Sequence, residues 1–101
     1  MIAFLFCVLP ILDPNLQAVA EERVSYMQQH HYCWHPPFRI GRLWGVHGGV
    51  RARFEGAGWG RAGLDPKRLG TCRPRPRRRL TLAADAVARG PRGTYRIRIW
   101  K

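Results

Sequence analysis

Residues 94–100, TYRIRIW, form the most strand-like stretch of the chain, because apolar and other side chains alternate along it. Tyr95, Ile97 and Ile99 would point to one side of such a strand, and Arg96, Arg98 and Trp100 to the other. The pattern therefore predicts an amphipathic strand close to residue 101.

The second clear element is a helix near the other end of the chain. Asp13 is suited to the N-cap and Pro14 to the first helical position, where its missing N–H costs nothing. Apolar residues and one histidine recur there at three- and four-residue steps, which predicts one buried stripe with Glu21, Glu22, Gln28 and Gln29 facing outward. The stripe consists of Leu16, Val19, Ala20, Val24, Met27 and His31. Two consecutive prolines at 36 and 37 end this segment.

The sequence pattern in the middle of the chain predicts a hairpin followed by a loop. Residues 38–46 are a strand candidate, residues 47–49 a turn, and residues 50–55 a strand, with Glu55 on the same polar side as Arg51 and Arg53. Residues 56–70 contain five of the eleven glycines, which favours a flexible loop. Further on, four alanines between Thr81 and Gly90 predict a short helix over residues 82–89.

Composition limits what these elements can build. Eight of the 24 Leu, Ile, Val and Phe residues lie within residues 1–12, so the rest of this 101-residue chain has little apolar material for a core. We therefore predict a small and largely irregular α+β fold with an N-terminal helix, a glycine-broken hairpin, a C-terminal strand and substantial disorder. The expected segments are hydrophobic residues 1–20, the helix and His/Cys cluster 21–37, the glycine-rich hairpin and loop 38–72, the arginine tract 73–79, and a short helix and strand 80–101.

Charge is distributed as unevenly as apolar content. Residues 1–38 carry a net charge of −2 (one base, three acids) and residues 39–101 carry +14 (17 bases, three acids). The positive charge is densest over residues 67–79, where seven of thirteen residues are basic and none is acidic. Clustered guanidinium groups repel one another, and an array of phosphates relieves that repulsion on contact.

The tract therefore predicts a non-enzymatic binder of RNA, DNA or another polyanion. Its phosphate contacts would come from Lys67, Arg68, Arg73, Arg75, Arg77, Arg78 and Arg79. Trp44, Trp59, Tyr95 and Trp100 each lie within a few residues of an arginine and could stack on bases. The alternative for these rings is a place in the core.

Residues 2–12 leave two localisations open, the nucleus and the cell exterior. The segment is too short to span a bilayer but suits the core of a secretory signal, with a small-residue cleavage site at 18–20. Cleavage after Ala20 would leave Cys33 and Cys72, and a disulfide between them would contribute about 4 kcal/mol to stability. The alternative function is thus a secreted, disulfide-bonded cationic peptide that acts at anionic membranes or cell surfaces. Against cleavage, no Lys or Arg precedes the apolar stretch, and Asp13 fits a helix start better.

A third alternative is a translated GC-rich reading frame without a selected function. Arg outnumbers Lys by 16 to 2, and Arg, Gly, Pro and Ala, which have GC-rich codons, make up 45 residues. Selection for phosphate contact would also favour Arg over Lys.

Other chemistry is poorly represented, so we predict no metal, no cofactor, no catalytic residue and no small-molecule substrate. His30, His31, Cys33 and His35 are potential ligands, but the paired spacing of zinc sites is absent. Residues 58–63 match GxGxxG, yet Asp65 and Pro66 follow where a helix would have to continue. Ser25 is the only serine, and Cys33 beside His31 and His35 is the one nucleophile and base candidate.

Overall fold

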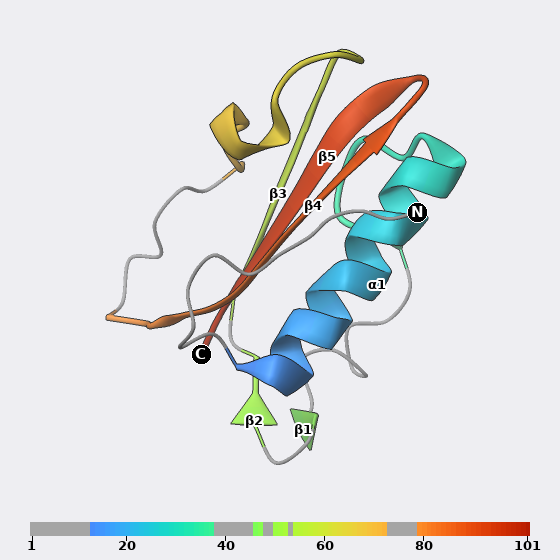
Figure 1. Cartoon of the computed structure of the whole chain (residues 1–101). Helices are drawn as coiled ribbons and strands as arrows, with labels where there is room; N and C mark the ends of the chain where they lie inside the picture. Colours follow the sequence, from blue (N-terminus) through green and yellow to red (C-terminus); the bar gives the residue numbers. More distant parts are fainter. Residues whose placement is uncertain (1–12, 38–45, 48–49, 53, 73–78) are drawn as a thin grey trace.

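The computed structural model describes residues 13–37, 46–47, 50–52, 54–72 and 79–101. In these residues one α-helix covers one side of a three-stranded antiparallel sheet, and a two-stranded ribbon lies apart from that sheet (Figure 1). The elements are α1 (Pro14–His30), β1 (Val46–His47), β2 (Val50–Arg51), β3 (Phe54–Gly60), the 3₁₀ turn η1 (Pro66–Arg68), β4 (Leu82–Gly90) and β5 (Gly93–Trp100). The small α+β class predicted from the sequence is confirmed.

Helix α1 begins as its sequence predicts. Asp13 Oδ1 accepts hydrogen bonds from the backbone N–H groups of Asn15 (2.9 Å) and Leu16 (3.1 Å). The stripe is buried as expected from Leu16 to Met27, whereas His31 lies just beyond the last helical residue, in the left-handed conformation (φ 49°). The Asp13 N–H donates to the carbonyl oxygen of Ala83 (2.7 Å), which ties the start of α1 to β4.

The predicted C-terminal strand is confirmed as β5, the central strand in the order β3-β5-β4. Tyr95, Ile97 and Ile99 face α1 and are buried with its apolar stripe in one core cluster. Arg96 and Arg98 point to the opposite side of the sheet, as the alternation requires.

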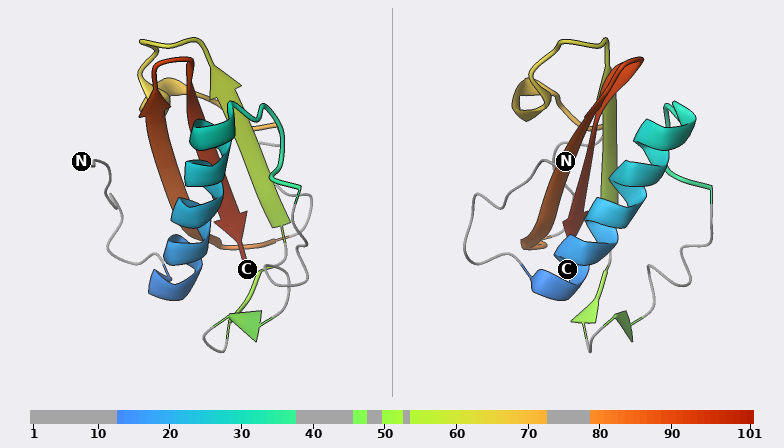
Figure 2. Two further views of the ribbon diagram at one scale, coloured as in Figure 1. Left: turned by 90° about the vertical axis from the view of Figure 1, so that its right-hand side faces the viewer. Right: turned by 45° about the vertical axis from the view of Figure 1, so that its right-hand side comes forward.

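The helix predicted over residues 82–89 is wrong, because this segment forms β4. Its register with β5 runs from Leu82 opposite Trp100 to Gly90 opposite Gly93, with an irregularity between Leu82 and Ala84. Alanine favours helices, but an isolated helix of two turns is marginal, and pairing with β5 outweighs that preference. Helix α1 lies over the sheet (Figure 2), and the small side chains of Ala83, Ala84 and Ala86 are buried in the core cluster between them.

The loop predicted over residues 56–70 is wrong in its first part, since Gly56 to Gly60 belong to β3. Gly58 shows why a glycine-rich segment is suitable for this strand. A Cβ atom at this position would lie 1.9 Å from the carbonyl oxygen of Gly70, so the absent side chain permits residues 70–71 to cross β3 closely.

Part of the predicted hairpin is observed in the described residues. Val46 pairs with Arg51, and His47 pairs with Val50, so His47 is a strand residue and not part of the turn. Phe54 and Glu55 begin β3 instead of ending the hairpin. The strand candidate over 38–45 and the turn residues Gly48 and Gly49 lie outside the described residues, as does the hydrophobic segment 1–12.

Candidate functional site

The described ends of the basic tract lie on the surface. Lys67 and Arg68 in η1 and Arg79 at the end of the tract are exposed. Arg73, Arg75, Arg77 and Arg78 lie outside the described residues, so their predicted contacts stay a prediction. Figures 1 and 2 show η1 on the side of the sheet opposite α1.

A buried arginine holds η1 against the sheet. Arg96 Nη1 donates to the carbonyl oxygens of Lys67 (3.0 Å) and Leu69 (2.9 Å). The Asp65 side chain caps the turn by accepting from the Lys67 N–H (3.0 Å). These contacts fix the backbone from which Lys67 and Arg68 project.

Arg96 is in turn paired with Asp85 from β4. Its Nε and Nη2 donate to the two carboxylate oxygens at 2.9 and 2.6 Å. Arg98 Nε lies 3.6 Å from the same carboxylate, and within the described residues it makes no hydrogen bond. Burial, together with the neighbouring Arg96, lowers the pKa of Arg98 below its ordinary value. This face thus brings two guanidinium groups to one carboxylate.

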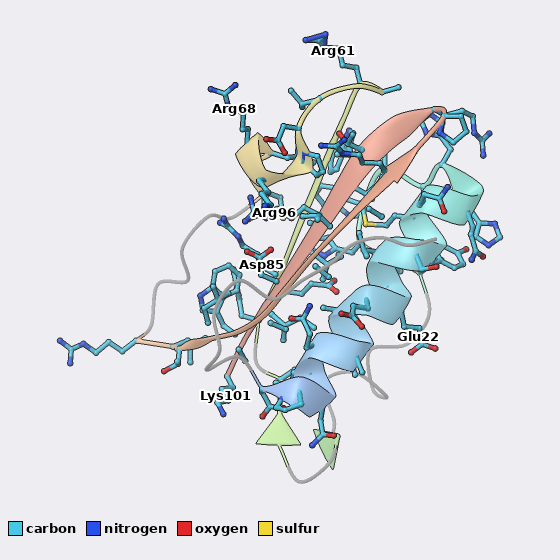
Figure 3. The ribbon with its side chains drawn as sticks, in the orientation of Figure 1. Glu22, Arg61, Arg68, Asp85, Arg96 and Lys101 are labelled. Atoms are coloured by element: carbon cyan, nitrogen blue, oxygen red, sulfur yellow. The ribbon has the colours of Figure 1, made fainter. Side chains whose placement is uncertain are left out.

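The acidic residues are either engaged in the fold or carried by α1. Within the described residues four of the six acids form ion pairs, namely Asp13 with Lys101, Glu55 with Arg23 and His35, Asp65 with Arg89, and Asp85 with Arg96 and Arg98. The other two, Glu21 and Glu22, are exposed on α1. Glu22 and the exposed Arg68 point away from opposite sides of the sheet, and the exposed Arg61 lies beyond the end of β3 (Figure 3). The exposed bases of η1 thus lie on the side of the sheet opposite Glu21 and Glu22, although the exposed Asp65 lies with them and the exposed Arg92 contacts the end of α1.

The predicted stacking residues have separated into buried and exposed ones. Tyr95 and Trp100 are buried, and burial raises the pKa of the Tyr95 hydroxyl above its ordinary value of 10.0. Trp59 remains 39% exposed and packs edge-to-face on Trp34, which is 52% exposed, with ring centroids 5.6 Å apart. Trp44 lies outside the described residues.

Cys33 and Cys72 are both free, exposed thiols in this structure. Cys33 Sγ lies 3.9 Å from the carbonyl oxygen of His31, whereas Cys72 Sγ lies 3.3 Å from Nε2 of His35. The disulfide between them stays a prediction that belongs to the secreted alternative.

Cys72 belongs to a cluster that the sequence analysis did not identify. His35 Nδ1 lies 2.7 Å from Glu55 Oε1, so the imidazole bridges the carboxylate and the thiol. Arg23 binds both oxygens of Glu55, through Nε to Oε2 and through Nη2 to Oε1 (3.1 Å). Four segments thus converge at the edge of β3: α1, the 31–37 segment, β3 itself and the segment after η1.

One signal in the sequence points to this cluster. Arg23 lies on the predicted apolar stripe, seven residues after Leu16 and four before Met27, and a lone charge there requires a buried partner. Glu55 was expected on the polar side of a hairpin strand, yet it is buried because Arg23 neutralises it. The pairing of His35 with Cys72, and not with Cys33, depends on a contact across 37 residues that local spacing does not reveal.

Two further kinds of feature are missing from the described residues. No group of three or more His, Cys, Asp or Glu side chains is arranged there to hold a metal ion. No helix in the described part of the chain has the length and apolar character needed to cross a membrane.

Comparison of the chain with protein-family models, with curated proteins and with solved structures finds no match.

Proposed function

We propose that the protein is a non-enzymatic binder of nucleic-acid phosphates, with residues 67–79 as the main contact. The observation that carries the proposal is the density of charge there, seven bases among thirteen residues without an acid. Phosphate chains bind such tracts because each neutralised phosphate releases a counterion.

The surroundings of the tract support this proposal. Arg61, Lys67 and Arg68 are exposed near η1, while the exposed carboxylates of Glu21 and Glu22 belong to α1 on the other side of the sheet. Asp65 is also exposed on the η1 side, where it pairs with Arg89, but exposed bases outnumber it there and would attract an approaching polyanion. Trp59 and Trp34 provide exposed ring surface for unpaired bases. Trp59 lies opposite Tyr95 on the face toward α1, so a single strand that contacts both the rings and the tract would pass around the edge of β3.

The salt dependence of binding tests the proposal. Affinity of the full chain for fluorescent single-stranded RNA is measured by anisotropy over a range of salt concentrations. We expect a linear log-log plot with a slope of about −0.7 for each phosphate neutralised. Replacement of the five arginines of residues 73–79 by glutamine should make the slope less negative, by the amount that corresponds to several fewer neutralised phosphates.

The control variant has the same net charge as the tract variant, but its arginine tract is intact. It carries glutamine in place of five arginines elsewhere in the sequence, namely Arg39, Arg42, Arg51, Arg53 and Arg92. If both variants lose the same slope, binding follows net charge alone and the tract has no special role. If the full chain binds vesicles rich in anionic lipid but not RNA, the membrane alternative replaces the proposal.

A further inference from the structure

The thiol of Cys72 is held between an imidazole and a backbone amide. In addition to His35 Nε2 at 3.3 Å, the N–H of Ala57 points at Cys72 Sγ from 3.5 Å. The backbone N–H of Cys72 donates to the Ala57 carbonyl oxygen (2.8 Å), so this residue is fixed to the free edge of β3. Cys72 is nevertheless an exposed residue.

The hydrogen bonds assign the proton positions. An ionised carboxylate only accepts hydrogen bonds, so Glu55 takes the bond from Nδ1–H of His35. That tautomer leaves Nε2 of His35 as an acceptor directed at the thiol of Cys72. Proton transfer from sulfur to Nε2 yields a thiolate beside an imidazolium, and the thiolate is the reactive form of cysteine.

The carboxylate of Glu55 is itself held in position by Arg23. Arg23 binds both oxygens of Glu55, and its Nη2 also donates to the carbonyl oxygen of Pro36 (3.2 Å). The same guanidinium therefore fixes the carboxylate and the backbone next to His35. Such an arrangement of nucleophile, base and orienting group is the general form of an activated nucleophile.

An exposed aromatic pair adjoins the imidazole. The Trp34 ring packs edge-on against His35 (centroids 4.9 Å apart) and against Trp59. These rings provide a surface close to the sulfur, on which the flat apolar group of an electrophile can pack.

From this geometry we infer that Cys72 is a nucleophilic thiol that undergoes exchange with low-molecular-weight disulfides bearing an apolar or aromatic group. The Ala57 amide points at the sulfur itself, so it stabilises negative charge on sulfur, as exchange requires. The reaction is stoichiometric, and the inference is independent of polyanion binding.

Disulfide exchange leaves one half of the small disulfide bound to Cys72 and releases the other half as a thiol. The Cys72 thiolate attacks one sulfur of the disulfide, a new S–S bond to Cys72 forms, and the original S–S bond breaks. The Cys72 sulfur is oxidised, and the departing sulfur is reduced to a thiolate. That thiolate takes up the proton that His35 received from Cys72, so a free thiol leaves.

The test measures the rate at which Cys72 reacts with dithiodipyridine, whose released thione absorbs light. Cys7 and Cys33 are replaced by serine so that Cys72 is the only thiol. We expect the folded protein to react at least about tenfold faster than the same protein unfolded in urea. His35→Gln should lower the folded rate to near the unfolded one, because glutamine keeps a polar group but cannot take up the proton. Equal folded and unfolded rates would overturn the inference.

Three further variants separate activation from structure. His30→Gln removes an imidazole that stacks on Tyr26, away from the thiol, and should leave the rate unchanged. Gly58→Ala should slow the reaction by displacing the backbone that leads to Cys72, whereas Gly70→Ala, where a Cβ meets open space, should not. If His35→Gln reacts as fast as His30→Gln while both stay folded by circular dichroism, His35 does not activate the thiol.

Discussion

The two faces of the β3-β5-β4 sheet are stabilised in different ways. On one face, Ile97 and Ile99 pack against the apolar stripe of α1, an interaction without directional requirements. On the other face, Asp85, Arg96 and the carbonyl groups around η1 make directed, charge-assisted hydrogen bonds. The stability of the apolar face therefore depends on the volume of the buried side chains, and that of the polar face depends on individual hydrogen-bond partners.

This difference connects the fold to the proposed ligand. A single carboxylate, that of Asp85, serves both Arg96 and Arg98 on the polar face, close to the bases of η1. Anions from solution would relieve the remaining repulsion between the basic groups on the polar face. They would have little effect on the apolar face under α1.

The largest expected effect comes from removal of the first part of α1. A chain that starts at Glu21 lacks the Asp13 cap and three buried residues, Leu16, Val19 and Ala20. The loss should exceed about 5 kcal/mol, which is comparable to the whole stability of a small domain. Thermal unfolding followed by circular dichroism should show no cooperative transition. A chain that starts at Asp13 is the control and should unfold cooperatively.

This result also bears on the secreted alternative, which requires cleavage after Ala20. A cooperative transition in the chain that starts at Glu21 would show that the apolar face does not need those residues.

Ile97→Ala tests the apolar face at its centre. Ile97 is completely buried, so the substitution should lower the free energy of unfolding by about 2–5 kcal/mol. Val87→Ala is the matched change on the polar face, because Val87 lies opposite Arg96 and is half-buried. It should cost less than about 1.5 kcal/mol. Urea titration measures both values, and equal losses would remove the distinction between the faces.

Arg96→Met and Arg98→Met compare two neighbouring arginines on the polar face. Arg96→Met leaves two carbonyl groups and most of Asp85 without their donor, so it should destabilise by about 2 kcal/mol. Arg98→Met removes a charge whose pKa is lowered by burial and by Arg96, so its effect should lie within about 0.5 kcal/mol of zero. Urea titration would contradict this view if Arg98→Met were the more damaging change.

Sequence reasoning succeeded where one local pattern carried the structure. The Asp13 cap, the stripe of α1 and the alternation in β5 follow from spacing along the chain and were predicted. The alanine-rich β4 and the glycine-rich β3 were missed, because pairing with β5 decides their conformation against local preference. The same reason explains the missed cluster around Glu55, whose partners come from distant segments. Arg23 on the apolar stripe was the one local sign of it.

The central position of β5 also sets the order of events during synthesis. Residues 14–90 supply the helix and both flanking strands, but neither β3 nor β4 has a partner in this sheet until residues 93–100 exist. Before that point the ribosome carries a chain with unpaired strand edges and a run of arginines. Unpaired strand edges favour association with other chains, so the sheet is most open to mispairing before residues 93–100 are available.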